Sequence, residues 1–282
     1  MAEIQKIAFQ GSLGAYSHMA CRKVVPDAEV IPCESFADML TLATNGTVDA
    51  AMVPVENSTA GRVADIHHLL PGTGLHIIGE HFQPVSHCLL GLPGAELSQI
   101  TEAHSHEQGL AQCRNTLQSH GIKPIIHSDT AGAAKDIAAR AEPHIGAIAS
   151  RLAGEIYGLD ILLEAAEDLD ANTTRFLLMA PNAMVPAVRS DCMTTMIFTV
   201  RSVPAVLYKA LGGFATNGIN LTKLESYMRG GQMGAAQFYV DCEGHIDDDA
   251  MQHALDELRF YCVEDGVRIM GCYPASTARK TS

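Results

Sequence analysis

Short apolar runs alternate with helix-like stretches through about the first 180 residues of the chain. The runs, each of a length suited to one buried strand, lie at residues 4–9, 30–33, 50–55, 76–78, 88–92, 124–126, 145–149 and 176–179. Apolar positions recur every three or four residues, as on one face of a helix, at residues 16–25, 36–43, 110–117 and 131–139. This alternation predicts an α/β region built on mainly parallel sheet.

A turn-rich stretch at Gly91, Pro93 and Gly94 divides this region near its middle. We therefore expect two lobes, with a ligand cleft between them, because ligands of open α/β sheets bind in such crevices. Lobe one is expected at about residues 1–83 and 164–182, and lobe two at about 84–163. The return of the chain to lobe one after residue 163 is inferred partly from the family resemblance given below. Residues 1–182 would then form one domain.

The pattern changes after residues 181–186, PNAMVP, which predict a linker. The remaining chain predicts a strand at 193–200, a helix at 204–216, strands at 219–227 and 235–241, a helix at 247–261 and a strand at 267–273. This β-α-β-β-α-β order is that of a ferredoxin-like unit. Pro204 at the start of the first helix and Gly218 just after its end fit the residue preferences of helix termini.

Composition narrows the classes of function. The net charge of −13 argues against general binding to nucleic acid or a membrane surface. Eight cysteines are scattered without a CxxC pair, and residues 1–10 contain no apolar leader segment, so we expect reduced thiols and a cytoplasmic protein. No apolar stretch approaches the roughly 20 residues of a membrane span.

Four segments in a fixed order carry a family resemblance. They are FQGSLGAYSHMA at residues 9–20, VPVENSTAGRVADIHHLL at 53–70, HSHEQGLAQC at 104–113 and NTTRFLLM at 172–179. Over about residues 4–275 the chain resembles the prephenate dehydratase family. The resemblance implies a carbon-oxygen lyase that converts prephenate to phenylpyruvate in L-phenylalanine biosynthesis. It also implies a two-lobed, periplasmic-binding-protein-like catalytic domain at 1–182 and a regulatory ACT domain at 192–275.

The reaction removes a ring hydroxyl and CO2 from a substrate with two carboxylates, and it requires no redox cofactor and no metal. Thr174 is, by the resemblance, the essential catalytic residue, and its hydroxyl can donate a hydrogen bond to the departing hydroxyl group. Arg175 offers a planar set of donors for a carboxylate. Phe176 would exclude water, and Asn172 and Thr173 complete this substrate-binding segment. The alternative from the residues alone is an exposed turn with Arg175 in a surface ion pair.

A second candidate segment follows the apolar run at 50–55, where loops of α/β proteins often line a cleft. Asn57 and Ser58 are neutral donors for substrate oxygens, and Gly61 permits close approach of the backbone. Glu56 is expected either to donate a proton, if burial raises its pKa, or to orient another group. A helix N-terminal cap formed by Ser58 or Thr59 is the structural alternative.

Lobe two is expected to contribute Ser105 and His106, which precede a helix that begins near Glu107. Because helix N-termini attract anions, these residues predict a second carboxylate site, although a lone histidine is more often structural than catalytic. The pairs His67/His68 and His104/His106 each lack a third ligand at suitable spacing, so we expect no metal.

The resemblance places a phenylalanine-binding face in the ACT domain. The candidate effector residues are Ala205, Val206, Leu207, Asn217, Asn220, Leu221, Glu225 and Ser226. Such effectors usually bind between two chains, which implies a homodimer or homotetramer. Ala205-Val206 stands where the family usually has Gly-Ala, and Tyr227-Met228 where it usually has Arg-Pro. The added bulk at Ala205 and Val206 would narrow the effector pocket.

Two other functions remain open at this stage. Arogenate dehydratase acts on a substrate that carries an amino group in place of the side-chain keto group, a difference that one or two pocket contacts decide. A non-catalytic protein that binds an amino acid is the other alternative, and the intact segment at residues 172–176 argues against it.

Overall fold

The computed structural model describes residues 4–169, 171–187, 190–228 and 236–281. The chain forms two compact units: unit 1 contains His68–Glu80 and Leu177–Ser282, and unit 2 contains Ala2–His67 and His81–Phe176. The boundary falls within strands β5 (His76–Pro84) and β11 (Thr173–Ala180), which contribute residues to both units. The domain boundaries predicted at residues 182 and 192 stay a prediction.

One mixed sheet holds the first strands of the chain in the order β2-β1-β3-β11-β5, with β4 paired to β3. Strand β1 pairs in parallel with β2 and β3, and β4 pairs antiparallel with β3. The strands not yet given bounds are β1 (Lys6–Gln10), β2 (Glu29–Cys33), β3 (Ala50–Asn57) and β4 (Gly61–Arg62). The accompanying helices are α1 (Tyr16–Val24), α2 (Phe36–Thr44) and α3 (Ala64–Leu69).

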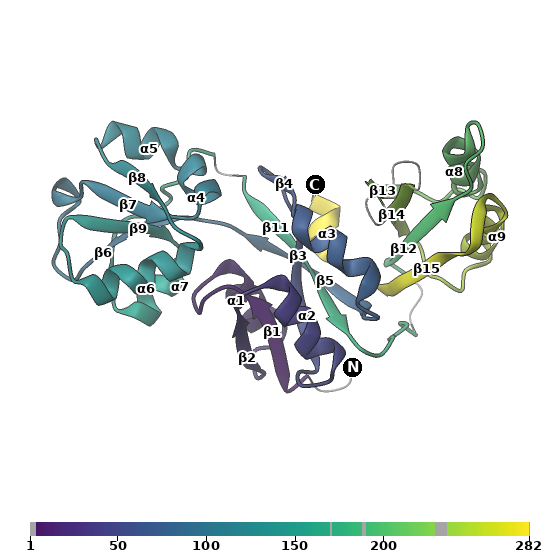
Figure 1. Cartoon of the computed structure of the whole chain (residues 1–282), viewed down its shortest axis with the longest axis horizontal. Coiled ribbons are helices and arrows are strands. Elements are labelled where there is room, and N and C mark those ends of the chain that lie inside the picture. Colours follow the sequence, from purple (N-terminus) through teal and green to yellow (C-terminus); the bar gives the residue numbers. More distant parts are fainter. Residues whose placement is uncertain (1–3, 170, 188–189, 229–235, 282) are drawn as a thin grey trace. The chain divides into compact units, whose positions relative to one another are not determined.

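The second sheet forms lobe two, within unit 2, and its order is β10-β6-β9-β7-β8. Its strands are β6 (Cys88–Gly91), β7 (Glu102–Ser105), β8 (Lys123–Ile126), β9 (Ile145–Ala149) and β10 (Asp160–Leu163). Helices α4 (Glu107–Gln112) and α5 (Arg114–Ser119) lie on one side of it, and α6 (Thr130–Arg140) and α7 (Arg151–Tyr157) on the other (Figure 1). Strand β7 is parallel to its neighbours, but β6 is antiparallel to β9 and β10, so the sheet is mixed, with antiparallel pairs that the expectation of mainly parallel sheet did not locate.

The single helix predicted at residues 110–117 is two helices that meet at Cys113. Cys113 has φ −110° and ψ 18°, outside the helical region. The Asp168 carboxylate accepts hydrogen bonds from the backbone N–H groups of Asn115 (3.0 Å) and Thr116 (3.2 Å). These groups at the start of α5 would otherwise lack partners. The cap comes from a distant loop, so local spacing does not reveal it.

Unit 1 contains the predicted ferredoxin-like unit, and the fold class is thereby confirmed. Its elements are β12 (Cys192–Val200), α8 (Val206–Thr216), β13 (Leu221–Met228), β14 (Ala236–Glu243), α9 (Asp249–Tyr261) and β15 (Cys262–Pro274). The antiparallel sheet has the order β13-β14-β12-β15, with α8 and α9 on one face (Figure 1). Residue 235, where the third strand was expected to begin, lies outside the described residues.

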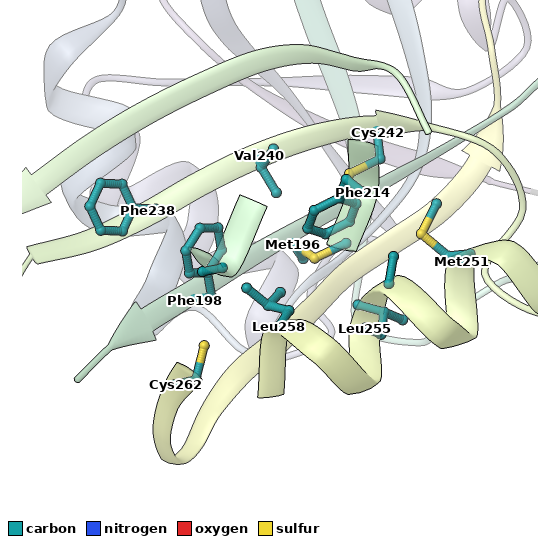
Figure 2. Close-up of a cluster of buried hydrophobic side chains, with 12 residues drawn as sticks. Met196, Phe198, Phe214, Phe238, Val240, Cys242, Met251, Leu255, Leu258 and Cys262 are labelled. Carbon is teal, nitrogen blue, oxygen red and sulfur yellow. The ribbon is translucent and has the colours of Figure 1, made fainter. Parts of the chain in front are cut away.

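The core of this unit lies between the sheet and its two helices. Figure 2 shows Met196 and Phe198 of β12 and Val240 of β14 on the side of the sheet that faces Leu255 and Leu258 of α9. Each of these side chains is fully buried. Burial of one large apolar side chain contributes about 1.5–3 kcal/mol. Positions that face this core must therefore be apolar, and their regular spacing made the β-α-β-β-α-β order recognisable in the sequence.

A buried ion pair joins two distant segments within unit 1. The Arg279 guanidinium donates to both carboxylate oxygens of Glu80, over 2.6 and 2.8 Å, and the backbone N–H of Ser276 donates to the same carboxylate. The Glu80 side chain is completely buried. Nearby, a Cβ on Gly271 would lie 2.1 Å from the Ile77 carbonyl oxygen, so only glycine permits this approach. Strand β5 is thus held by both β15 and the C-terminal tail.

Helix α8 begins two residues later than predicted. Its N-cap, Ala205, has φ 57° and ψ 22°, in the left-handed region, so Pro204 lies outside the helix. The left-handed conformation brings Cβ too close to the following carbonyl oxygen, at a cost of about 1–2 kcal/mol for a residue other than glycine. The backbone therefore explains why glycine is usual at this position in the family.

We expect Ala205→Gly to raise the free energy of unfolding by about 1 kcal/mol, because glycine removes the left-handed penalty but adds freedom to the unfolded chain. Urea unfolding followed by circular dichroism measures the change. Ala139→Gly, at an exposed position in α6, is the control and should lower stability by about 1 kcal/mol. Destabilisation by both substitutions would contradict the left-handed assignment.

Candidate active site

A cavity of about 570 Å³ lies within unit 2, and both lobes contribute to its wall. Lobe one supplies residues from the turn after β1, from β3 and β4, and from β11, while lobe two supplies residues from α4 and the start of α6. The lining residues on which the argument depends are Gly11, Tyr16, Asn57, Gly61, Arg62, His87, His106, Gln112, Asp129, Thr174 and Phe176.

The structure brings only part of the predicted substrate site to this cavity. The predicted residues that line it are Asn57, Gly61, His106, Thr174 and Phe176. The predicted residues that are not part of the lining are Glu56, Ser58, Ser105, Asn172, Thr173 and Arg175. Alternation along β11 explains much of this division, because successive side chains of a strand point to opposite faces. Thr174 and Phe176 share the cavity face, and Arg175 belongs to the other.

Arg175 is buried and paired with a carboxylate of its own chain. Its side chain is 2% exposed, and Nη1 lies 3.0 Å from Oε1 of Glu56, which is one-third exposed. A buried guanidinium needs such a partner, because an isolated buried charge is strongly unfavourable. Glu56 and Arg175, which were both expected to contact the substrate, instead pair with each other, and Glu56 orients Arg175. The arginine in the cavity lining is Arg62.

A short hydrogen-bond network holds the hydroxyl of Thr174. The Asn57 Oδ1 atom accepts from the backbone N–H groups of Thr59 (3.0 Å) and Ala60 (2.8 Å). The Asn57 amide NH2 must therefore point the other way, where it donates to Thr174 Oγ1 (2.9 Å) and to Asn172 Oδ1 (2.7 Å). Thr174 Oγ1 is thus an acceptor, and among the described residues no atom accepts its hydrogen. The hydrogen remains available to a ligand in the cavity.

Three cavity residues are absent from the predicted substrate site: Tyr16 and Gln112, which lie within the family segments, and His87, which lies outside them. Gln112 Oε1 accepts from Asn172 Nδ2 (2.9 Å) and lies 2.8 Å from His87 Nε2, while Tyr16 Oη lies 2.9 Å from His87 Nδ1. Gln112 and Tyr16 are neutral and His87 is isolated in the sequence, so charge and spacing do not mark them. For Tyr16 and Gln112, the position within segments 9–20 and 104–113 was the available signal, and for His87 there was none.

The residues proposed at the start of α4 separate in the structure. Ser105 is fully buried and donates to the Ile148 carbonyl oxygen over 2.6 Å, so it stabilises the sheet of lobe two. His106 lines the cavity and caps α4, with Nδ1 accepting from the backbone N–H of Gln108 over 3.2 Å. Only His106 can therefore contact a ligand without rearrangement.

Ser58 is neither a lining residue nor a helix cap. It exchanges backbone and side-chain hydrogen bonds with Thr173: Ser58 N–H donates to the Thr173 carbonyl, and Thr173 N–H donates to Ser58 Oγ, both over 2.9 Å. Helix α3 begins only at Ala64, so the alternative of a helix cap by Ser58 or Thr59 was wrong. Ser58 instead ties the loop after β3 to the start of β11.

The carboxylate of Asp129, in the cavity wall, accepts hydrogen bonds from two groups of the protein. Ser12 Oγ donates to Asp129 Oδ2 over 2.5 Å, and the backbone N–H of Ala131 donates to Oδ1 over 2.8 Å at the start of α6. The Ser12 bond also connects the turn after β1 with lobe two. Gly14 in the same turn has φ 92°, and a Cβ there would lie 2.7 Å from Ala153 Cα, so glycine is required for this approach.

Within the described ranges, no group of three or more His, Cys, Asp or Glu side chains is arranged to hold a metal ion. All eight cysteines are free and buried. Among the described residues, no helix combines the length and apolar character that a membrane crossing requires.

The predicted effector residues lie at two ends of α8 and along β13. Ala205, Val206 and Leu207 are at the start of α8, whereas Asn217 caps its end, with Nδ2 donating to the Gly213 carbonyl oxygen over 2.8 Å. The helix has 11 residues and is about 16 Å long at 1.5 Å per residue, so both ends cannot line one small pocket in one chain. The other four belong to the approach to β13 or to this edge strand: Asn220, Leu221, Glu225 and Ser226.

Comparisons with known proteins place this fold and cavity in a family of lyases. The family model of prephenate dehydratase matches residues 7–184, so the chain belongs to the prephenate dehydratase family. It is 46% identical, over 97% of each chain, to a bifunctional N-acyl-homoserine lactone acylase/prephenate dehydratase of Komagataeibacter europaeus. It is 40% identical to arogenate dehydratase/prephenate dehydratase 1, chloroplastic, of Arabidopsis thaliana, over 97% of this chain and 73% of that one.

A solved structure extends the similarity to both units. The prephenate dehydratase of Arthrobacter aurescens in complex with L-Phe has a TM-score of 0.87 and 32% identity, with 98% of this chain and 94% of that chain covered. The predicted family membership and lyase class are confirmed.

The turn that carries Gly11 to Tyr16 depends on a neutral histidine. His18 Nδ1 accepts from the backbone N–H of Gly14 over 2.9 Å, and its ring stacks on Phe9. Burial lowers the pKa of His18 below the ordinary histidine value of 6.5, and the nearby Arg22 lowers it further. Since protonation of Nδ1 would break the bond to Gly14, the folded protein requires the uncharged ring.

The free energy of unfolding is therefore expected to fall as pH decreases below about 6.5. Between the folded and unfolded pKa values of His18 the unfolded chain binds more protons, so stability is fully present above 6.5 and is lost toward the folded value. His18→Asn retains an acceptor for Gly14 but does not titrate. Urea unfolding between pH 5 and 8 should show a shallower dependence for this variant than for wild type or for the exposed control His120→Asn. Equal slopes in all three proteins would contradict the requirement.

Proposed function

We propose that this protein is a prephenate dehydratase that converts prephenate to phenylpyruvate, water and CO2. The observation that supports this most directly is the hydroxyl of Thr174, which lines the cavity and accepts a hydrogen bond while its own hydrogen has no acceptor among the described residues. Membership of the prephenate dehydratase family indicates the reaction class. Within the cavity, the Thr174 hydroxyl is available to donate a hydrogen bond to the leaving hydroxyl of the substrate.

The chemistry asks little of the protein beyond position and hydrogen bonding. The ring C–O bond and the bond to the ring carboxylate break, the released electron pair completes the aromatic ring, and hydroxide leaves with a proton as water. Thr174 donates to the departing oxygen, and the hydrogen bond that it accepts from Asn57 polarises its hydroxyl in the favourable direction. Phe176 closes the cavity beside it against water.

We propose that Arg62 and His106 contact the substrate carboxylates, because both line the cavity, one from each lobe. Arg175 was predicted from the sequence to bind a substrate carboxylate, but it would contact substrate only if its ion pair with Glu56 opened. In the closed pair it holds Glu56 and with it the end of β3. Asn172 and Thr173 support the site without contacting substrate: Asn172 orients the amide of Asn57, and the backbone of Thr173 binds Ser58.

Thr174→Val and Thr173→Val form a matched pair that tests this function. The two threonines are adjacent on β11 and, by strand alternation, belong to opposite faces. Loss of one transition-state donor lowers kcat by about 10²–10³-fold, so we expect this loss for Thr174→Val, with far smaller effects for Thr173→Val and for Thr174→Ser.

The measurement is the rate of phenylpyruvate formation from prephenate, with circular dichroism as the check on folding. Equal rates for the two valine variants would contradict the assignment of Thr174. Parallel assays with arogenate determine which substrate is preferred. Faster turnover of arogenate would leave the proposed chemistry unchanged and identify the enzyme as an arogenate dehydratase. If wild type consumes neither compound, the alternative of a non-catalytic amino-acid-binding protein takes precedence.

Amide hydrolysis of N-acyl homoserine lactones is a second candidate activity. The observation that favours it is the 46% identity, over 97% of each chain, to a relative whose name carries both activities. Release of homoserine lactone from an N-acyl homoserine lactone by wild type, at the same rate in Thr174→Val, would show an additional activity independent of the dehydratase residues. The absence of release would limit this chain to the lyase reaction.

We propose that residues 192–275 are an ACT domain that binds L-phenylalanine between two chains and inhibits the enzyme. The β-α-β-β-α-β order and the related structure with L-Phe support this assignment. A binding site between chains accounts for the separation of Ala205–Leu207 from Asn217 along α8, since each end would face a different partner. The eight free cysteines support a cytoplasmic, reducing location.

Isothermal titration with L-phenylalanine should show binding below millimolar concentration, and light scattering should show a homodimer or homotetramer. Ala205→Gly is expected to strengthen binding, because it removes one methyl group beside the first turn of α8. Absence of heat at millimolar phenylalanine for both proteins would contradict the effector proposal, whereas oligomerisation could persist without it.

A further inference from the structure

A buried histidine outside the predicted site connects the cavity wall to the Thr174 network. His87 precedes β6, is 2% exposed and lines the cavity. Its backbone is fixed on both sides: the N–H donates to Glu167 Oε2 over 2.7 Å, and the carbonyl accepts from the N–H of Ala166 over 2.8 Å. The backbone that carries the ring is therefore held independently of the contacts that the ring nitrogens make.

The directions of the hydrogen bonds around this ring follow from backbone donors elsewhere in the site. Backbone N–H groups can only donate, so they fix Asn57 Oδ1 as an acceptor and its NH2 as the donor to Asn172 Oδ1. Asn172 Nδ2 then faces Gln112 Oε1. Gln112 Nε2 donates to Thr59 Oγ1 over 2.7 Å, which is free to accept because its own hydrogen is donated to Asn57.

These directions determine which ring nitrogen of His87 carries hydrogen. Gln112 Oε1 can only accept, so His87 Nε2, at 2.8 Å, must be protonated. Burial lowers the pKa of His87, which keeps the ring neutral and leaves a lone pair on Nδ1. That lone pair lies 2.9 Å from Tyr16 Oη, and burial raises the pKa of Tyr16 well above its usual value, so the phenol keeps its hydrogen. Tyr16 shares this hydrogen between His87 and the Ser86 carbonyl oxygen at 2.7 Å.

We propose that His87 is a positioning residue which, as the neutral Nε2–H tautomer, holds the Gln112 carboxamide in the orientation that reaches Thr174 through Asn172 and Asn57. If Gln112 turned over, its NH2 would face the NH2 of Asn172, two donors without an acceptor between them. Asn172 and then Asn57 would lose their fixed directions, and Thr174 would lose the hydrogen bond that aims its hydroxyl. The inference rests on the proposed dehydratase function of Thr174.

Two substitutions at the same site separate this role from simple filling of space. In His87→Gln the amide nitrogen reaches the position of Nε2 and can still donate to Gln112. In His87→Asn the amide nitrogen reaches only the position of Nδ1, beside Tyr16. We expect His87→Asn to lower kcat by about 10–100-fold with KM within about threefold, and His87→Gln to retain kcat within about fivefold of wild type, since misplacement of a reacting group by about 1 Å costs up to 100-fold.

Steady-state kinetics with prephenate measure the difference, and thermal unfolding checks that both variants are folded. Equal kcat values for the two variants, or a loss confined to KM, would overturn the positioning role. A second measurement needs neither variant nor substrate: the 15N chemical shifts of the His87 ring in wild type at pH 7.5 identify the protonated nitrogen. Protonation at Nε2 alone is expected, and protonation at Nδ1 alone would overturn the proposal. If wild type does not consume prephenate, the dehydratase function fails, and the 15N result still decides the tautomer.

Discussion

The orientation of one side-chain amide, that of Asn57, determines the direction of every hydrogen bond around Thr174. Two backbone N–H groups in the turn after β3 fix its oxygen, and its NH2 must then donate to both Thr174 and Asn172. Gln112 on α4 receives the next bond, so the network passes from lobe one to lobe two without any ionised group. Neutral amides suit this position, because their orientation does not change with pH and a buried charge would require a counter-ion.

Two turns of lobe one, after β1 and after β3, connect the lobes of unit 2. Gln112 Nε2 donates to Thr59 Oγ1, and Ser12 Oγ donates to Asp129, so the lobes are joined by polar bonds at the cavity itself. Ser150 Oγ also donates to the Gly14 carbonyl oxygen over 2.5 Å. Neither a nonpolar interface nor a lone salt bridge would provide such directional contacts. The cavity shape is therefore tied to the hydrogen bonds that also orient Thr174.

Sequence reasoning located the segments of this site better than the individual side chains. The periodic apolar pattern of residues 193–273 predicted the ferredoxin-like unit, because its core residues recur at regular positions on strands and helices. Residues 172–176 were assigned to the substrate as a block, but a strand presents only alternate residues to one face, so Arg175 points away from Thr174. The break at Cys113 and the left-handed Ala205 depend on a distant carboxylate and on backbone geometry, which no local pattern contains.

Local pairing, rather than the net charge of −13, decides whether this cavity can accept an anion. At physiological ionic strength exposed charges more than about 8 Å apart are largely screened, so the acidic surface has little effect inside the cavity. The nearby carboxylates are matched within the chain: Glu56 pairs with Arg175, and Asp129 accepts from Ser12 and the start of α6. Arg62 and His106 line the cavity from opposite lobes. In the proposed function, a dianionic substrate would place its carboxylates against these two side chains and its ring beside Phe176, with the leaving oxygen next to the Thr174 hydroxyl.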